Sequence, residues 1–502
     1  MGVAGTAALG GCGDAERGNG GRATPAVTAS GTPGSPAPRA APTGRGVPWG
    51  ALERGLEGRL IRPGDAAYSQ ARRLHMPRFD GRRPAGIAYC ANPDDVRECV
   101  EFARRHAVPP ALRSGGHGYA GWSTGPGLVI DVSALDRVRY DAASGLAEVG
   151  AGTRLVDMYA RLARDGVSVP GGTCPTVGIA GLALGGGIGV MSRKYGLTCD
   201  TIREVRIVTA DGRLVTADAR RHPDLYWASR GGGGGNFGVV VSFLFQAHRT
   251  QDVTMFRVWW PWRRAAAVLR AWQEWGPGAP AELWSNVQLY GPPTIEVMGV
   301  FLGDAADLDR HLDRLEARVG AEPAGRVARR RSYQETMMSV AECSSMTVEQ
   351  CHRRGTLPGT TPSGRWPRAD YTAKSHFATR PLPAPAVHDL VRRVDGRGRS
   401  VILDALGGAV SGVPAGATAF PHRSALFSLQ YLSSPGDRPW LRAVHRAMDR
   451  HLGPRAYVNY TDPELRDWQR AYHGPNLPRL RRVKSAYDPA RLFDFPQAIP
   501  PA

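Results

Sequence analysis

The stretch LRSGGHGYAGW, residues 112–122, places one histidine, His117, inside a run of glycines. Glycine gives the backbone access to positive φ and lets backbone N–H groups come close to a bound molecule. A tight turn that happens to contain a histidine would give the same pattern. The alternative is that something flat and bulky must come within bonding distance of the imidazole.

Two further glycine clusters, residues 171–189 and 231–238, lie in the same half of the chain. Two of the three clusters contain the spacing GxGxxG, once from Gly116 and once from Gly233. A Rossmann site is nevertheless excluded, because neither spacing stands between a strand and a helix N-terminus, where that fold binds phosphate. Successive backbone N–H groups can also bind a pyrophosphate without a helix. Three clusters in one module therefore favour a long, anionic, planar cofactor over a set of unrelated turns.

The pattern between residues 84 and 248 mixes strands and helices. DDVRECVEFARRHA has the spacing of an amphipathic helix, with Asn92 or Asp94 placed as its N-cap. GLVIDVS, LAEVGAG, REVRIVTADGRLVTA and GVVVSFLFQA have strand patterns, and the ADG at residues 210–212 is a hairpin tip. No regular βαβ repeat is present, so the predicted class is α+β.

Beyond residue 250 the strands become rich in aromatic residues, as in FRVWWPW, ELWSNVQLYG and IEVMGVFLG. Helices such as AAVLRAWQEW and DLDRHLDRLEARV separate them. This order predicts a second domain with an antiparallel sheet backed by helices.

Charge and targeting signals restrict the partners. The 502-residue chain carries a formal net charge of +19, but its arginines are spread thinly and form no recognised nucleic-acid module, so we expect no nucleic-acid partner. No apolar run reaches the roughly 18 residues of a membrane helix. LGGC, ending at Cys12, is similar to a lipoprotein cleavage box without its basic leader. We expect an exported protein that could carry a lipid anchor at Cys12, with a cytoplasmic protein as the alternative.

The cysteine pattern argues against a metal site. None of the seven cysteines forms a CxxC pair, so we expect no zinc or other metal. Cys343 and Cys351 could form a disulfide if the protein is exported. Cys90 and Cys99 are expected to be buried as small apolar side chains.

Four segments together resemble the berberine bridge enzyme-type flavoprotein oxidases, whose flavin module is of the vanillyl-alcohol oxidase, or PCMH, type. They are RSGGHGYAGWS, PGGTCPTVGIAGLALGGGIGVMSRKYGLTCD, RGGGGGNFGVVVSF and the C-terminal stretch from YVNYTD to FPQAIP. The resemblance covers residues 84–502, is weakest between 251 and 397, and is nearest to bacterial oligosaccharide and antibiotic-tailoring oxidases. It implies a two-part PCMH-type FAD-binding domain at 48–250, with its core at about 80–250, and a substrate-binding domain at 251–454. A signal-like or disordered segment and linker would occupy 1–47, and a C-terminal segment, 455–502, would return to the FAD domain.

The resemblance implies FAD held by two covalent bonds, one from His117 to the flavin 8α-methyl group and one from Cys174 to flavin C6. Small neighbours would let the backbone approach the ring. Val177 matches the position that controls access of oxygen in this family. The full set of residues expected to hold the cofactor is His117, Cys174, Arg113, Ser114, Gly115, Gly116, Gly118, Thr173, Val177, Gly178, Gly181, Gly186, Gly187, Gly238, Val239 and Asn459.

The resemblance also implies alcohol oxidation, in which flavin N5 takes a hydride and a base takes the hydroxyl proton. YVNYTD, interpreted as a strand, carries Tyr457 and Tyr460, and Tyr460 is the preferred base. Asp404, on the predicted strand VILDALGG, would orient the substrate or tune the tyrosine, while Tyr119 and Gln430 would contact the substrate. Some plant members have a lysine at the position of Ile402, so the cation that tunes the tyrosine is not identified by sequence.

The expected partners are a small-molecule substrate, such as a sugar, a glycoside or a natural-product intermediate, and O₂, which would be reduced to H₂O₂. One alternative keeps FAD but oxidises a carbon–nitrogen centre or closes a ring. An alternative of another class is a catalytically silent, secreted flavin-binding protein.

Overall fold

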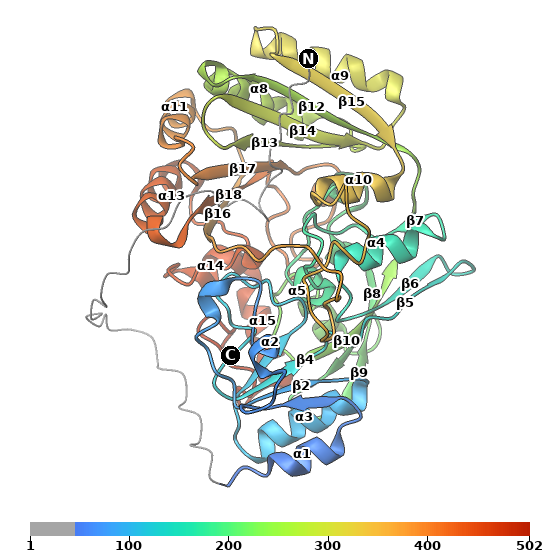
Figure 1. Cartoon of the computed structure of the whole chain (residues 1–502). Coiled ribbons are helices and arrows are strands. Elements are labelled where there is room, and N and C mark those ends of the chain that lie inside the picture. The colour runs from blue at the N-terminus through green and yellow to red at the C-terminus, as the bar shows by residue number, and fades with distance from the viewer. Residues whose placement is uncertain (1–45) are drawn as a thin grey trace.

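The computed structural model describes residues 46–502, and it has two parts (Figure 1). The N-terminal part combines residues 46–250 with the C-terminal segment from about residue 456. The sheet part is built around seven strands between residues 253 and 433. The predicted α+β class is confirmed. The predicted signal-like segment and the lipid anchor at Cys12 lie outside the described residues.

The first sheet of the N-terminal part is mostly parallel, with the order β1-β2-β4-β3. β1 pairs antiparallel with β2, while β2, β4 and β3 run parallel. The predicted amphipathic helix forms as α3, and Asn92 rather than Asp94 is its N-cap, accepting a hydrogen bond from the Asp95 N–H at 2.9 Å. The elements are α1 (Trp49–Gly55), β1 (Arg59–Ile61), α2 (Tyr68–Ala71), β2 (Gly86–Tyr89), α3 (Pro93–Arg105), β3 (Pro110–Arg113) and β4 (Leu128–Asp131).

The second sheet of this part is antiparallel, with the order β5-β6-β10-β8-β9. The turn between β8 and β9 contains residues 210–212, so the predicted hairpin is confirmed. The elements are β5 (Val138–Asp141), β6 (Leu146–Gly150), α4 (Leu155–Ala163), β7 (Val167–Ser168), α5 (Ile179–Leu184), α6 (Ser192–Tyr195), β8 (Ile202–Val208), β9 (Leu214–Ala217), α7 (Pro223–Ala228), β10 (Val239–Gln246) and β11 (His248–Arg249).

The sheet part is one antiparallel sheet with the order β15-β12-β14-β13-β17-β18-β16. Helices α8, α9, α11 and α13 cover one of its faces (Figure 1), as the sequence predicts. The strands are β12 (Val253–Pro261), β13 (Leu283–Leu289), β14 (Thr294–Phe301), β15 (Gly325–Arg331), β16 (Thr372–Ala378), β17 (Ser400–Ala405) and β18 (Phe427–Ser433). The helices are α8 (Ala265–Gly278), α9 (Ala305–Val319), α10 (Tyr333–Val340), α11 (Ala384–Arg393), α12 (Ala409–Gly412) and α13 (Arg438–Leu452).

Strand alternation decides which side chains face the N-terminal part. In β17, Val401 and Leu403 pack beneath the helices, while Ile402 and Asp404 point to the opposite face. Neighbouring strands alternate in the same way, because successive side chains of a strand lie on opposite faces. The uncovered face of the sheet therefore becomes a wall between the two parts.

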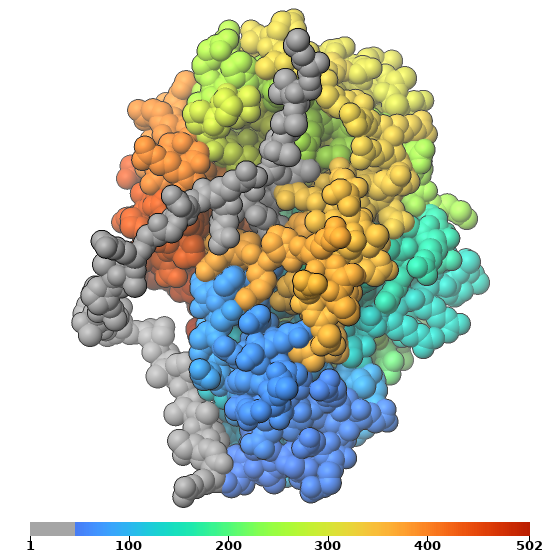
Figure 2. All heavy atoms as spheres, viewed as in Figure 1, coloured from blue at the N-terminus to red at the C-terminus, as the bar shows by residue number. Residues whose placement is uncertain are grey.

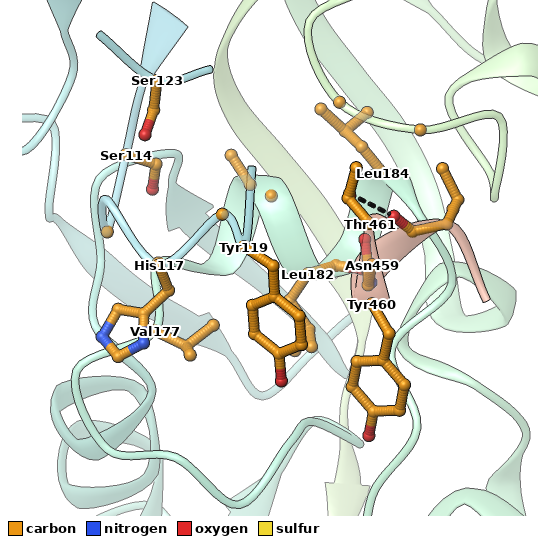
Figure 3. Close-up of a pocket in the computed structure, with 18 of the residues that line it drawn as sticks. Ser114, His117, Tyr119, Ser123, Val177, Leu182, Leu184, Asn459, Tyr460 and Thr461 are labelled. Atoms are coloured by element: carbon orange, nitrogen blue, oxygen red, sulfur yellow. Dashed lines mark hydrogen bonds between the residues drawn. The ribbon is translucent and has the colours of Figure 1, made fainter. Parts of the chain in front are cut away.

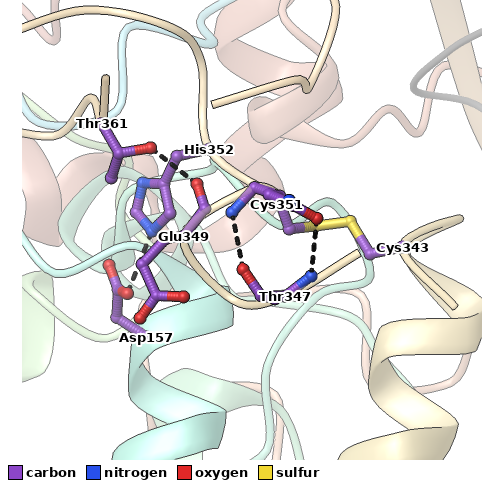
Figure 4. Close-up of a disulfide and its surroundings, with 8 residues drawn as sticks. Asp157, Cys343, Thr347, Glu349, Cys351, His352 and Thr361 are labelled. Carbon is purple, nitrogen blue, oxygen red and sulfur yellow. Dashed lines mark hydrogen bonds and ion pairs between the residues drawn. A yellow bond between two sulfur atoms is a disulfide. The ribbon is translucent and has the colours of Figure 1, made fainter. Parts of the chain in front are cut away.

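Residues 341–371, here called the strap, leave the sheet part after α10 and cross the surface of the N-terminal part (Figure 2). Two ion pairs hold its far end. Arg368 binds the Asp80 carboxylate through two hydrogen bonds, and Asp370 binds Arg78. Cys343 and Cys351 form the disulfide that the sequence leaves open, with their Cα atoms 5.9 Å apart (Figure 4). The prediction that Cys90 and Cys99 are buried is confirmed.

The C-terminal segment returns to the N-terminal part through η5 (Val458–Tyr460), α14 (Trp468–His473) and α15 (Leu477–Tyr487). The interpretation of YVNYTD as a strand is wrong, because residues 458–460 form a 3₁₀ turn. The buried Lys484 ammonium fixes the segment by donating to the Asn236 and Phe493 carbonyls and to Asp488. No helix within residues 46–502 is long and apolar enough to cross a membrane.

Candidate active site

A cavity of about 390 Å³ lies between the N-terminal part and the uncovered face of the seven-stranded sheet (Figure 3). This size falls within the usual range for cofactor and ligand sites. Loops that contain all three glycine clusters line one wall, and β13, β17 and β18 line the other. The predicted site residues that line it are Arg113, Ser114, Gly115, Gly116, His117, Gly118, Tyr119, Thr173, Cys174, Val177, Gly178, Gly181, Gly238, Val239, Asp404, Gln430, Tyr457, Asn459 and Tyr460.

Two of the glycines expected to hold the cofactor, Gly186 and Gly187, do not line the cavity. Both have positive φ, at 130° and 88°, and they form the layer behind the wall. A Cβ at Gly186 would lie 3.1 Å from the Phe420 ring, and the Gly187 N–H donates to the Tyr457 hydroxyl oxygen. These positions require glycine for packing rather than for direct contact with a ligand.

Other glycines leave room for a flat group. A Cβ added at Gly118 or Gly181 would meet no protein atom within 4 Å, although both residues line the cavity. A side chain at either position would project into open space. By contrast, a Cβ at Gly115 would lie 2.2 Å from the Gly178 nitrogen, so the first two clusters touch through their backbones. The donor set and the open room fit a planar cofactor lying against backbone.

His117 is held by two contacts that the sequence does not reveal. Its Nε2 lies 2.7 Å from the Thr176 hydroxyl oxygen, and its ring stacks on His75 with the centroids 4.0 Å apart. Burial is the first cause that lowers the pKa of His117 well below its usual value, and the neighbouring His75, Arg353 and Arg154 add to the effect. The imidazole is therefore neutral at pH 7, and a neutral ring nitrogen is a nucleophile.

Cys174 and Val177 lie in the loop before α5, on the same side of the cavity as His117. The Val177 N–H donates to the Cys174 carbonyl at 3.4 Å, which closes a short turn. In Figure 3 the Val177 side chain lies beside the His117 ring. The contact between Thr176 and His117 therefore places this loop, with Cys174 and Val177, beside the imidazole.

Four tyrosines gather at the other end, where the cavity meets the sheet. The rings of Tyr119 and Tyr460 stack almost parallel, 5.7 Å apart, and Figure 3 shows their hydroxyl groups pointing the same way. Tyr371, which the sequence does not suggest, packs edge-on against Tyr119 at 5.2 Å. The Gln430 amide donates to the Tyr119 hydroxyl at 2.7 Å. Tyr119 and Gln430 therefore act as one hydrogen-bonded unit.

Tyr457 and Tyr460 differ in their surroundings. The Tyr457 hydroxyl oxygen accepts hydrogen bonds from the Gly187 N–H at 2.8 Å and the Asn459 amide at 2.9 Å. The Tyr460 hydroxyl makes no hydrogen bond within the described part of the chain. Burial is the first cause that raises the pKa of Tyr460 well above its usual value, and the charge of Asp404 raises it further. Tyr457 braces the wall, while the Tyr460 oxygen is available to a ligand.

Asp404 sits in a row of polar side chains on the sheet. The Asn286 amide donates to its carboxylate at 3.4 Å, and the Gln288 amide donates to the Asn286 carbonyl oxygen at 3.2 Å. Burial raises the pKa of Asp404 to about 6. Because the charge of Asp404 raises the pKa of Tyr460, Asp404 does not favour the phenolate form of Tyr460.

Asn286 and Gln288 were missed at the sequence level. The sequence does contain a signal, because Asn286 and Gln288 share one face of β13 with Trp284 in ELWSNVQL. Two amides in a fully buried strand are unusual unless they have partners. For His75, Thr176 and Tyr371 no local pattern exists, since they reach the site from separate loops.

The fold and the cavity define a flavin-binding oxidoreductase. The family model for an FAD binding domain matches residues 84–218, and the model for berberine and berberine-like proteins matches residues 456–500. The chain is 33% identical to the uncharacterised FAD-linked oxidoreductase YgaK of Bacillus subtilis, over 89% of this chain and 97% of that protein. It is 31% identical to xylooligosaccharide oxidase of Thermothelomyces thermophilus, over 84% of this chain and 88% of the relative. The structure of BBE-like 1 from Physcomitrella patens superposes with a TM-score of 0.83 at 30% identity, over 90% of this chain and 98% of that one.

The chain therefore belongs to the berberine bridge enzyme-like family of PCMH-type, FAD-linked oxidoreductases. Its relatives include oxidases, and it is an enzyme of that kind. FAD is its cofactor.

Proposed function

We propose that this enzyme oxidises an alcohol or hemiacetal carbon of a polyhydroxylated substrate, such as a sugar, a glycoside or a glycosylated natural product, and passes the electrons to O₂. One observation carries the proposal. On one wall of the cavity, the sheet carries the polar row Gln288–Asn286–Asp404 and Gln430. Gln430 donates to Tyr119 on the opposite wall, here called the glycine cradle because the three glycine clusters line it. Buried hydrogen-bonding groups select ligands that can satisfy them, and a substrate with several hydroxyl groups does so. The relative named xylooligosaccharide oxidase supports this substrate class.

FAD would be held covalently by the imidazole of His117 and the sulfur of Cys174. The neutral state of His117 supports its part, because only a neutral nitrogen can form the bond. When bound, FAD supplies a hydride acceptor at N5 and returns the two electrons to O₂ as H₂O₂. Val177 is small enough to leave the flavin accessible to O₂, which favours O₂ as the acceptor.

The chain itself handles the proton. The Tyr460 oxygen, which has no competing hydrogen bond within residues 46–502, accepts the proton of the substrate hydroxyl as the hydride leaves the same carbon. Tyr460 can take that proton only if its own proton moves on. Asp404, ionised above about pH 6, is the nearby group that can receive it. The C–H and O–H bonds break, a C=O bond forms, and the proton ends on Asp404.

The remaining polar groups position the substrate. Gln430 fixes Tyr119, whose ring stacks on Tyr460 and limits its rotation. Gln288 and Asn286 offer amide groups along the sheet. The disulfide in the strap favours an extracytoplasmic location, because disulfides persist in oxidising compartments.

Three measurements test the proposal together. The purified protein should stay yellow after acid precipitation, and digestion should give flavin-bearing peptides around His117 and Cys174. The enzyme is then assayed against mono- and oligosaccharides, glycosides and alkaloid amines. It should release H₂O₂ with the saccharides and glycosides. A colourless pellet would overturn the covalent attachment. Peroxide release with amines alone would overturn the substrate class while leaving the family intact.

A further inference from the structure

Three arginines lie near one another beside His117: Arg113, which lines the large cavity, and Arg154 and Arg353, which do not. Arg113 and Arg154 are 5% and 2% exposed, and Arg353 enters from the strap. Arg113 binds the Asp131 carboxylate, and Arg154 donates to the Ser133 hydroxyl at 3.0 Å. Asp131 accepts the Ser133 N–H, so Arg113 and Arg154 meet at the same corner.

Arg154 lacks an anionic partner. Its guanidinium donates to two neutral oxygens, the Gly152 carbonyl at 2.8 Å and the Ser133 hydroxyl, while its Nε is buried without an acceptor. No carboxylate of residues 46–502 lies within ion-pairing distance of it. The strap closes over the group, because a Cβ at Gly359 would lie 1.9 Å from Arg154 Nη2.

Arg353 also lacks an anionic partner within residues 46–502. Among the residues that the structure describes, none forms an ion pair or a side-chain hydrogen bond with it, and its Nε is buried. Burial, followed by the charges of Arg154, Arg113 and Arg368, lowers the pKa of Arg353 to about 9. The Arg113 Nη1 is also buried without an acceptor. Three guanidinium groups therefore each keep at least one unsatisfied buried N–H.

Arg193 shows how this chain treats a buried arginine that needs no ligand. Its guanidinium is 1% exposed and has no carboxylate partner in the described range. Backbone carbonyls surround it instead, including those of Leu283 at 2.8 Å and Pro277 at 3.2 Å, with Leu406 and Ala279 in contact. No such carbonyl cage surrounds the unsatisfied atoms of Arg154 and Arg353, so their acceptor comes from elsewhere.

His75 adds a fourth donor at the same place. It is fully buried, it stacks on His117, and neither of its ring nitrogens has a hydrogen-bond partner within residues 46–502. Burial, together with the charges of Arg353 and Arg368, lowers its pKa to about 3, so the ring is neutral and carries one N–H to donate. An unsatisfied buried N–H costs roughly 1–3 kcal/mol, more for a charged group.

The cofactor does not supply the acceptor for Arg154, Arg353 and His75, since these three, unlike Arg113, are not among the residues that line the large cavity. No carboxylate of residues 46–502 supplies it either. We propose that a small monovalent anion, chloride in a physiological medium, binds between Arg113, Arg154 and Arg353 beneath the strap and accepts the His75 N–H. One negative charge offsets the repulsion among the guanidinium groups and gives each unsatisfied donor a partner. The anion would also join the strap to the layer that supports His117.

Diffraction from crystals of the holoenzyme soaked in bromide, at the bromine absorption edge, tests the site directly. The expected result is an anomalous peak within hydrogen-bonding distance of guanidinium nitrogens from at least two of the three arginines. A site filled by water, or an empty one, would overturn the proposal, whatever bromide does elsewhere on the surface.

Solution stability tests whether the anion matters at ordinary concentrations. The Tm of the holoenzyme is measured while chloride replaces methanesulfonate at constant ionic strength, and it should rise with chloride and then saturate, because a ligand that binds only the folded state stabilises it. Arg353→Gln should abolish the chloride dependence. Arg354→Gln, at the adjacent exposed position, is the matched control and should keep it.

The two measurements separate the outcomes. A wild-type Tm that ignores chloride, or a chloride response that survives Arg353→Gln, would contradict the proposal. If Arg353→Gln fails to fold, the bromide position in wild-type crystals still decides. Neither result bears on the substrate or on flavin attachment, so failure here and failure of the proposed function are distinguishable.

Discussion

At the scale of single residues, the site gives two tyrosines of one sequence motif, Tyr457 and Tyr460, different surroundings. The Tyr457 hydroxyl oxygen accepts hydrogen bonds from the Gly187 N–H and the Asn459 amide. Tyr460 stacks on Tyr119, and its hydroxyl makes no hydrogen bond within the described chain. The environment, rather than the residue type, assigns one to the wall and the other to the substrate. Asp404, with a pKa of about 6, supplies the basic group that a buried phenol cannot supply alone.

Tyr460→Phe should lower the rate of flavin reduction by about 10²- to 10⁴-fold, the usual contribution of a positioned base. The visible spectrum of the bound flavin should not change. Stopped-flow reduction under anaerobic conditions measures this. Tyr457→Phe is the matched control and should mainly lower the Tm, because it leaves a buried N–H without its acceptor. Equal kinetic losses in both variants would contradict the assignment.

Thr176→Val should reduce the fraction of flavin bonded to His117. The substitution keeps the shape of the side chain but removes the hydroxyl that lies 2.7 Å from Nε2, so the ring loses the contact that fixes its orientation. Peptide mass spectrometry of the two attachment regions measures the effect, and the bond to Cys174 serves as the internal reference. If occupancy at His117 equals that of the wild type, Thr176 does not orient the ring.

At the scale of elements, local pattern accounts for most of what was predictable. α3, the β8–β9 hairpin and β17 follow from periodicity and turn residues. Alternation in β17 places Asp404 and Leu403 on opposite faces of the sheet. The segment YVNYTD fails for a tertiary reason. Its residues favour strands, yet Tyr457 N–H donates to the Ser375 hydroxyl and the chain turns there instead of joining a sheet. The strap has no periodic pattern, so its course over Arg154 could not be predicted.

The disulfide in the strap gives a prediction at this scale. The Cys343→Ser/Cys351→Ser double variant should lose about 2–3 kcal/mol of unfolding free energy, since the bond closes a loop whose ends are 8 residues apart. Chemical denaturation of oxidised wild type and variant measures it. The variant should also be more readily cleaved by protease within the strap. Identical denaturation midpoints would mean that contacts such as His352–Asp157 hold the strap without help from the disulfide.

At the scale of the whole molecule, the two parts meet across a cavity whose walls hold polar groups that the packing leaves under-satisfied. The N-terminal part contributes the glycine cradle, His117, Tyr119 and Tyr460. The sheet part contributes the polar row and Gln430. Such an arrangement costs folding free energy, because a buried ionised carboxylate is poorly solvated. The sequence motifs identify the family. The unfavourable burial of a carboxylate is visible only in the structure, where the two parts enclose it.

Asp404→Asn should therefore stabilise the fold while it impairs catalysis. Burial raises the folded-state pKa of Asp404 from 3.8 to about 6, so between these values the folded protein binds a proton that the unfolded chain has lost. Stability then falls as pH rises through this window, by about 3 kcal/mol in total, and the neutral amide avoids the loss. Urea unfolding at pH 4, 5, 6 and 7 should show variant and wild type nearly equal at pH 4 and the variant more stable at pH 7. Asp165→Asn, at an exposed carboxylate, is the control and should show no such divergence. A stability difference that is independent of pH would mean that Asp404 is not ionised within the folded site, and the proton would then have to leave Tyr460 by another route.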